Sequence, residues 1–280
     1  MNKIKYALLF IIASIPISFI GYIVREAATT ANMFTINFYR FLTAAIALAI
    51  ILPFIDKKTF KPSKKNLKMY SIIGFLIALN LTMFNIANTI APIANVYLLA
   101  SISPAVVILL STMYLKEKVT QAKLIALMLT LIGLTIMNPL QNSNMTGNIL
   151  ALLSGATFGV MFTLLKKEAI TGAGANFWYF TFATIFSTPL LYFGSAGIIS
   201  ALPWILTLGI ISTALSYIAT TLILREETAG TTIILQTIII PLGAVLIAYG
   251  AFGEIPTIKI MIGGIILITG GIALEVPKMM

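Results

Sequence analysis

The sequence contains no cysteine and no histidine, and only 8 of its 280 residues are acidic. Without thiols and imidazoles, disulfide bonds, thiol catalysis and the usual zinc sites are excluded. Few side chains remain for general acid–base or metal chemistry, so we expect no enzyme activity, no cofactor and no metal site. The chain also lacks a glycine-rich lysine loop of the Walker type, so nothing in it indicates ATP-driven pumping.

Charged residues are scarce as well, at 9% of the chain against 59% for hydrophobic residues. A soluble domain carries about 25% charged residues. Apolar runs of about 20 residues, long enough to cross a bilayer, recur along the whole chain. A lone strand would leave its backbone unsatisfied in lipid, and no alternating pattern of a β-barrel is present. The composition therefore predicts an all-α polytopic membrane protein whose surroundings are the lipid bilayer.

Turn-like polar breaks divide the apolar sequence into ten predicted transmembrane helices. Each predicted helix is long enough, or nearly so, to cross the hydrocarbon core. They cover residues 6–25, 34–54, 68–88, 92–114, 121–138, 147–166, 175–193, 203–223, 229–250 and 257–275.

The 18 lysines and arginines give a net charge of +10, which at first suggests a nucleic-acid partner. Nearly all of them fall in loops on the N-terminal side of the predicted topology. Arg25 and Lys259 fall on the opposite side, and Arg40 lies inside the second span. Because cytoplasmic loops collect basic residues, we predict a multi-pass protein of the plasma (inner) membrane with both termini in the cytoplasm. Topology explains the charge, and we expect no nucleic acid to bind.

Two stretches of the chain resemble each other, residues 103–133 and residues 240–270. Each is an apolar run opened by proline, followed by a polar break with Glu and Thr and then by a second apolar run. Internal similarity of this kind indicates a repeat. The coincident positions are Pro104 and Pro241, Glu117 and Glu254, Thr120 and Thr257, and Gly133 and Gly270.

The repeat extends to both halves, which we place at residues 1–140 and 146–280. The second span contains NFYRF at residues 37–41, and the seventh contains NFWYF at residues 176–180. Because each half has an odd number of spans, five, the second half must be inverted in the membrane. Inverted repeats are typical of secondary transporters, in which exchange of conformation between the halves gives alternating access.

At these residues the chain resembles the EamA family of the drug/metabolite transporter superfamily. That family has two five-helix repeats, a proline early in the fourth helix of each half, and an L-G-E-x-x-T-like turn before the fifth. The matching residues are Pro104 with LKEKVT at 115–120, Pro241 with FGEIPT at 252–257, and Arg40 as the basic residue usual in the second helix. Lys116 stands where the pattern has glycine, so we expect that turn to differ in detail.

The resemblance covers nearly the whole chain and is specific for fold and transport. It implies a cavity walled by helices 1–4 and 6–9, with helices 5 and 10 supporting it from outside. Members of the family move amino acids, other small metabolites, choline-like cations, nucleotide precursors and S-adenosylmethionine. The resemblance therefore leaves the substrate open.

Arg40 lies farther from the ends of its predicted span than any other cation. A charge there costs about 2.5–3.5 kcal/mol on insertion scales, so it should face a cavity or a partner. One interpretation is that it attracts a carboxylate or phosphate of the substrate. The other is that it lies near the outer boundary and ties helix ends together, against Glu26 or backbone carbonyls.

Uncharged polar and aromatic side chains provide the other candidates for substrate binding. An amide inside a membrane seeks a hydrogen-bond partner, which a substrate or a neighbouring helix can supply. Trp178 and Tyr179 have a further alternative as aromatics at the membrane interface. The small residues from Gly155 to Gly159 indicate close helix packing. The full set of candidates is Arg40, Asn37, Asn80, Phe84, Asn88, Asn95, Tyr97, Ser101, Trp178, Tyr179, Tyr217 and Gln236.

Prolines inside spans free backbone carbonyls, so we predict that Pro16, Pro104 and Pro241 act as hinges. No Asp or Glu lies in the middle of a span, which argues against a proton-driven cation exporter. We interpret Glu117 and Glu254 as structural residues near helix starts, with Thr120 and Thr257 as helix caps.

These features together predict a secondary or facilitative transporter of a small polar metabolite, amino-acid-like or nucleotide-like, that works by alternating access. The alternative is uptake or efflux of organic cations, as in a choline transporter or a multidrug exporter. Both halves lie in one chain, so we expect a monomer to suffice, with a dimer as the alternative.

Overall fold

The computed structural model describes residues 3–55, 62, 64–137, 144–168, 174–194, 196–252 and 257–275. Within these residues the chain is almost entirely helical and contains no strand, which confirms the all-α prediction. Several predicted loop and turn residues lie outside this part of the chain, among them Asp56, Lys57, Pro139, Gly253 and Glu254.

The helices lie where the apolar runs predicted them. Up to residue 137 they are α1 (Lys3–Ser18), α2 (Ile20–Ala28), α3 (Met33–Ile55), α4 (Lys64–Ile90), α5 (Ile93–Ala100), α6 (Ser103–Leu115) and α7 (Gln121–Met137). From residue 145 they are α8 (Met145–Glu168), α9 (Ala175–Ser187), the 3-10 helix η3 (Thr188–Phe193), α10 (Ile198–Leu206), the π-helix η4 (Thr207–Leu215), α11 (Ser216–Glu226), α12 (Ala229–Phe252) and α13 (Ile258–Glu275).

Six helical stretches in the described part of the chain are long and apolar enough to cross a membrane, and three shorter apolar helices accompany them. The protein is therefore a multi-pass membrane protein. The six long stretches are Ile4–Ala28, Met33–Phe54, Asn66–Ile90, Asn95–Leu115, Met145–Glu168 and Ile198–Glu226.

Prolines interrupt two of the long stretches. The first helix ends at Ser18, two residues after Pro16, and α2 resumes at Ile20. The fourth predicted span breaks between α5 and α6, and Pro104 takes the second position of α6. Proline has no amide hydrogen and crowds the carbonyl four residues earlier, so it is tolerated at a helix start and disturbs a helix interior. Pro241 lies inside α12, which continues past it.

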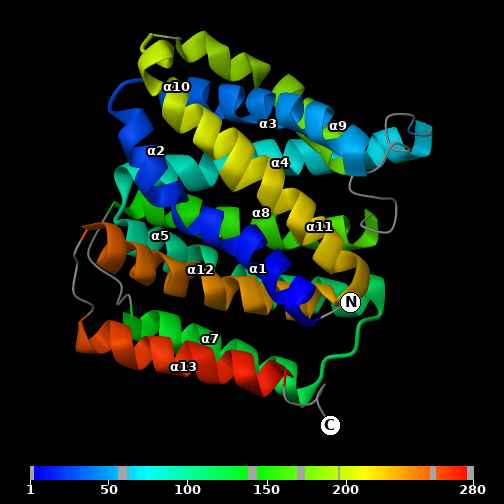
Figure 1. Ribbon diagram of the computed structural model, residues 1–280, viewed down its shortest axis with the longest axis vertical. Helices are drawn as coiled ribbons and strands as arrows, with labels where there is room; N and C mark the ends of the chain where they lie inside the picture. The colour runs from blue at the N-terminus through cyan, green and yellow to red at the C-terminus, as the bar shows by residue number, and fades with distance from the viewer. Residues whose placement is uncertain are drawn as a thin grey trace.

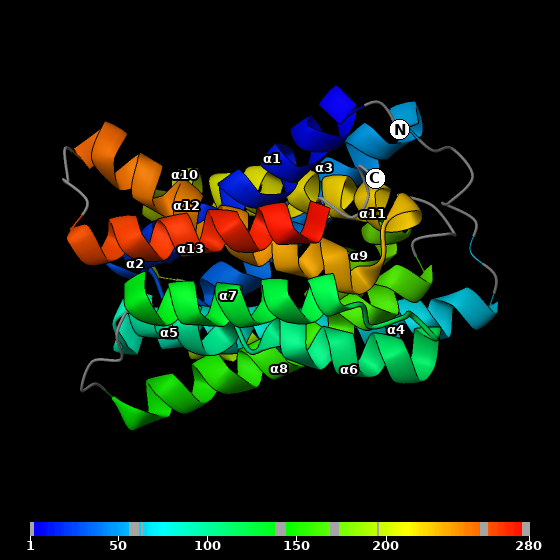
Figure 2. The same ribbon diagram turned by 90° about the horizontal axis from the view of Figure 1, so that it is seen from below.

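The helices run alongside one another across the molecule, and α1 begins at the same end at which α13 ends (Figure 1). The largest apolar core lies where α3, α4, α8, α9 and α11 meet. The α7 and α13 helices pack closely against each other along one edge, where they also touch α12 (Figures 1 and 2). They therefore lie outside the main group of helices.

Two glycines let α8 approach α5 and α6 closely. A Cβ atom added at Gly155 would lie 2.4 Å from the carbonyl oxygen of Ala100, and one at Gly159 would lie 2.6 Å from Cβ of Val106. Real Cβ atoms do not approach backbone this closely, so only glycine fits. The small residues at this position pack the helices together, as the sequence predicted.

We expect Gly155→Ala to destabilise the fold by about 1–3 kcal/mol, because the added methyl group must push two helices apart. Gly271→Ala is the matched control, since its Cβ would meet nothing nearer than Ile238 Cδ1 at 3.8 Å. Alanine favours helix over glycine, so this control should be neutral or stabilising. Thermal unfolding in detergent measures both variants, and an unchanged melting temperature for Gly155→Ala would contradict the packing.

The turn between α6 and α7 connects to a distant helix. Lys116 adopts the left-handed conformation (φ 55°) that glycine adopts most readily, so the turn has a glycine-type backbone despite the lysine. The carboxylate of Glu117 accepts hydrogen bonds from the backbone N–H groups of Ala229 (2.8 Å) and Gly230 (3.4 Å) at the start of α12. An anion is favourable at a helix N-terminus. Glu117 therefore has a structural role, as predicted, and it acts on α12.

Two further contacts complete this turn. Lys123 Nζ lies 3.7 Å from Glu117 Oε2, and both side chains are largely buried. The hydroxyl of Thr120 accepts from the backbone N–H of Lys123 at 3.3 Å, so Thr120 caps α7 as predicted.

Candidate functional site

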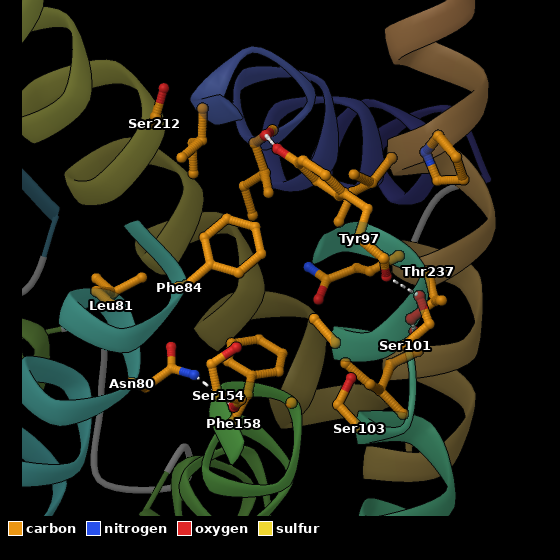
Figure 3. Close-up of a pocket in the computed structure, with 18 of the residues that line it drawn as sticks. Asn80, Leu81, Phe84, Tyr97, Ser101, Ser103, Ser154, Phe158, Ser212 and Thr237 are labelled. Carbon is orange, nitrogen blue, oxygen red and sulfur yellow. Dashed lines mark hydrogen bonds between the residues drawn. The ribbon is translucent and has the colours of Figure 1, made fainter. Parts of the chain in front are cut away.

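A cavity of about 130 Å³ lies among the central helices (Figure 3). Ten of its 21 described lining residues are polar or charged and eleven are apolar, so the wall can contact both polar and apolar parts of a small molecule. The lining residues are Ile17, Ile20, Arg40, Asn80, Leu81, Phe84, Tyr97, Ala100, Ser101, Ser103, Leu134, Ser154, Gly155, Phe158, Ser212, Tyr217, Ile233, Gln236, Thr237, Ile240 and Pro241.

Among the described residues of this wall, Arg40 is the only charged one. Its side chain is buried, at 1% exposure, and its Nε donates to the hydroxyl of Thr213 at 2.9 Å. Nη1 is buried and has no hydrogen-bond partner among the described residues. Arg40 therefore lies in the cavity wall, and no ion pair with Glu26 is found in that part of the chain.

Aromatic rings form one side of the cavity. Phe84 and Tyr97 pack edge to face, with ring centroids 5.3 Å apart. The Tyr97 hydroxyl donates to the carbonyl of Ile17 and accepts from the backbone N–H of Gly21, both at 3.2 Å. These bonds hold the ring of Tyr97, which lies on α5, against the junction of α1 with α2.

Two amides line the cavity, and each already donates one N–H to a neighbouring helix. Asn80 Nδ2 donates to the carbonyl of Ser154 at 2.6 Å, and Figure 3 shows the amide oxygen on the opposite side. Gln236 Nε2 donates to the Thr220 hydroxyl at 2.9 Å. These bonds join α4 to α8 and α12 to α11, so the expected contacts between helices exist. The amide oxygens of both residues have no partner in the described part of the chain.

The structure brings together seven of the predicted binding residues and one predicted hinge. They are Arg40, Asn80, Phe84, Tyr97, Ser101, Tyr217 and Gln236, with Pro241.

Three predicted asparagines lie elsewhere. Asn37 Oδ1 accepts from Asn85 Nδ2, which joins α3 to α4. Asn88 is one turn beyond Phe84, and its Nδ2 donates to the Phe84 carbonyl at 2.8 Å. Asn95 Nδ2 lies 3.5 Å from the amide oxygen of Asn148 on α8. Each of these side chains is directed between helices, and none lines the cavity.

Trp178 and Tyr179 also lie away from the cavity. Tyr179 is 2% exposed and packs edge to face on Tyr70 at 5.3 Å, while Trp178 packs against the same core. No described residue of α9 lines the cavity, although the resemblance implied that the seventh helix would contribute. The α9 helix does not reach the cavity because it faces α3 and α4 with its apolar side. Conversely, Leu134 of α7 does line the cavity.

Several lining residues were not predicted as binding residues. Ser154 and Phe158 lie on α8, where the glycines drew attention to packing alone, and Thr237 lies next to Gln236. The only sequence signal for Ser154 is that it is a polar residue next to the glycines of a close helix contact. Ile17, Ile20 and Leu81 carry no signal that distinguishes them from lipid-facing residues.

Comparison with known proteins agrees with this architecture. Residues 4–138 and 145–275 match the EamA-like transporter family. The chain therefore belongs to that family, as its sequence motifs indicated, and it is a transporter.

Two curated relatives and one solved structure show how far the likeness extends. An uncharacterized transporter of Archaeoglobus fulgidus is 26% identical over 230 residues, which are 82% of this chain and 83% of that protein. The pseudopaline exporter CntI of Pseudomonas aeruginosa is 25% identical over 279 residues, or 97% of this chain and 96% of that protein. A crystal structure that is 13% identical shares the fold, with a TM-score of 0.80 and coverage of 97% and 96%.

Proposed function

We propose that this protein is a secondary transporter that carries a small polar solute with an anionic group, by alternating access. The observation that carries the proposal is Arg40, a buried cation in the cavity wall whose Nη1 has no partner among the described residues. A buried charge without a counter-ion is costly in a membrane. A carboxylate on the solute would supply that counter-ion and the missing hydrogen bonds.

The two amide oxygens extend the argument to the rest of the solute. Asn80 and Gln236 each use one N–H of the amide group, whereas their amide oxygens accept no hydrogen bond in the described part of the chain. A solute with a donor group, such as an ammonium or an amide, suits these acceptors. Arg40 and the acceptors together favour an anionic or zwitterionic solute, amino-acid-like or nucleotide-like.

We further propose that the chain crosses the membrane ten times as two inverted repeats. The ten segments are the six long apolar stretches, the three shorter apolar helices and α9 with η3. With ten crossings both ends of the chain fall on one side, and α1 begins where α13 ends (Figure 1).

A matched set of hydrogen bonds supports the repeat. Arg25, in the last turn of α2, donates to the carbonyls of Asn88 (2.9 Å) and Ala91 (2.8 Å) at the end of α4. In the other half, Lys166 in the last turn of α8 donates to the carbonyls of Leu224 (2.6 Å) and Glu227 (2.7 Å) at the end of α11. In both halves, a cation at the end of the first span donates to two backbone carbonyls at the end of the third span. The two carbonyls lie three residues apart in each case.

A second pair of contacts repeats in the same way. Asn37 on α3 bonds to Asn85 on α4, and Asn176 on α9 bonds to Thr221 on α11 at 3.1 Å. These pairs join the second and third spans of each half. The same polar connections in both halves are expected if the halves share one ancestral structure.

The basic residues support an orientation. The α6–α7 connection, the end of α8 and the α11–α12 connection lie at the end where α1 begins (Figure 1). These segments hold Lys116, Lys118, Lys166, Lys167 and Arg225. We propose that this end is cytoplasmic in a plasma membrane, and that a monomer is the transporting unit.

Transport of organic cations is the second candidate within the same family. The cavity gives it less support, because no described acidic residue lines the wall and the one charged residue there is cationic. The relative named as a pseudopaline exporter supports outward transport for this chain, without deciding between an anionic and a cationic solute.

Uptake into proteoliposomes tests the proposal. The labelled solutes are matched carboxylate and carboxamide pairs (leucine and leucinamide, lactate and lactamide), uridine monophosphate with uridine, and the cations choline and tetraethylammonium. We expect at least one carboxylate or phosphate member to be taken up about tenfold faster than its amide or nucleoside partner, since a charged hydrogen bond contributes about 1.5–3 kcal/mol. Transport of the two cations alone would overturn the proposal.

A further inference from the structure

The π-helix η4 is the most unusual backbone feature next to the cavity. It covers Thr207–Leu215, in the middle of the apolar stretch Ile198–Glu226. Helices of this type are rare and usually limited to one turn, and they occur frequently at functional sites. Here the π-helix runs directly past Arg40, which lies on α3.

The π-helix changes which carbonyl the Thr213 hydroxyl can reach. A threonine in an α-helix bonds to the carbonyl three or four residues earlier. Thr213 Oγ1 donates instead to the carbonyl of Leu208, five residues earlier, at 2.6 Å. The single hydroxyl hydrogen is thereby used, so the oxygen can only accept from another group.

That other group is the guanidinium of Arg40. Arg40 Nε donates to Thr213 Oγ1 at 2.9 Å, and Thr213 is completely buried. The guanidinium is planar, so a bond at Nε restricts the direction in which both terminal nitrogens point. Because Nε is occupied, a solute can meet Arg40 only through the terminal nitrogens, of which Nη1 is unpartnered.

The backbones on either side of this bond are in close contact. A Cβ atom added at Gly209 would lie 1.9 Å from the Thr43 hydroxyl and 2.9 Å from the carbonyl of Arg40. Thr43 in turn donates to the carbonyls of Tyr39 and Arg40, at 2.9 and 3.0 Å. The helix that carries Arg40 and the helix that carries Thr213 are therefore held at a fixed separation.

We propose that Thr213 is a positioning residue for substrate recognition. Through the π-helical turn, it directs the terminal nitrogens of Arg40 into the cavity and selects solutes that present two coplanar oxygens, as a carboxylate does. This inference rests on the proposed function, because it requires Arg40 to bind the solute. It identifies Thr213, which does not line the cavity, as the residue that sets the preference for a planar carboxylate over an uncharged amide.

Three substitutions test the positioning. Thr213→Val keeps the shape but removes the acceptor, Thr213→Ser keeps the hydroxyl, and Thr207→Val is the matched control. Thr207 lies in the same π-helix, and its hydroxyl bonds only to the carbonyl of Pro203 at 2.9 Å. Thr213→Ala, which introduces no new bulk, replaces the valine variant if the latter lowers the yield of folded protein. Leucine with leucinamide and lactate with lactamide are the probes, and uptake is measured against concentration.

For Thr213→Val we expect KM for the transported carboxylate to rise about fivefold, with the maximal rate changed by less than twofold, because a mispositioned cation weakens binding first. The ratio of carboxylate to amide uptake should fall by the same factor. Thr213→Ser should restore both values, and Thr207→Val should change neither.

The outcomes separate this inference from the proposed function. If the wild-type protein prefers carboxylates and Thr213→Val keeps both its KM and its preference, the positioning role is wrong and the function stands. If Thr213→Ser behaves like Thr213→Val, the hydroxyl is not the determinant and the inference is again wrong. If the wild-type protein transports uridine monophosphate but none of the carboxylates, this inference is wrong and the proposed function stands. If it transports neither the carboxylates nor uridine monophosphate, the proposed function fails, and this inference fails with it.

Discussion

Replacing Arg40 with methionine is expected to reduce carboxylate transport (as kcat/KM) by about a hundredfold or more. Truncating one partner of a buried, hydrogen-bonded charge pair costs about 2–5 kcal/mol, and the solute would supply the other partner here. Arg40→Lys keeps the charge but not the planar fork, so we expect an intermediate loss. Uptake into proteoliposomes measures both variants.

The same substitution should leave the protein at least as stable as before. Arg40 is buried without an ion pair in the described part of the chain, and Nη1 has no hydrogen-bond partner there. Replacing an isolated buried charge with an apolar side chain is neutral or stabilising. Loss of transport with an unchanged or raised melting temperature is the signature of a residue retained for function.

Two results would contradict this account of Arg40. Full transport in Arg40→Met would mean that no solute anion binds there. A melting temperature lowered by several degrees would mean that the guanidinium holds α3 against η4, which is a structural role. Lys167→Gln is the matched control, because it also removes one positive charge, but from an exposed residue that does not line the cavity.

The second large effect is expected when Lys166 or Arg25, the matched cations at the two ends of the molecule, is replaced. If the halves exchange conformations during transport, the bonds of Lys166 and those of Arg25 break in opposite states. Lys166→Gln should then favour the state open at the end where α1 begins, and Arg25→Gln the state open at the other end. Each variant loses two charge-assisted hydrogen bonds, so we expect about a tenfold shift in the ratio of the two states.

The absence of cysteine makes this shift measurable. A single cysteine placed at Ser103, which lines the cavity and makes no side-chain hydrogen bond among the described residues, would be the only thiol in the protein. The rate at which a membrane-impermeant maleimide labels it from each face reports the two open states. Lys167→Gln is the control, since Lys167 is the exposed neighbour of Lys166.

Opposite shifts in the two variants would support inverted repeats that alternate. A shift in the same direction, or none in either variant, would show that these bonds only stiffen the ends of helices. An effect of Lys167→Gln as large as that of Lys166→Gln would point to loss of charge in general and not to the hydrogen bonds.

The sequence alone determined the class of the protein and the position of its helices. Runs of apolar residues must become helices in a membrane, because no other single segment satisfies its own backbone there. The EamA-type motifs around Pro104 and Pro241 then indicated the family, which the comparisons confirm. Arg40 was identifiable for the same reason, since a charge inside an apolar run needs a specific explanation.

The tertiary structure decided which polar residues face the cavity. Hydropathy cannot tell a side chain that lines a cavity from one that joins two helices, because both are polar residues in apolar surroundings. Asn80 and Gln236 proved to do both, whereas Asn37 and Asn95 only join helices. The π-helix and the bond from Arg40 to Thr213 depend on how two segments 173 residues apart pack together, and no local pattern in the sequence encodes that contact.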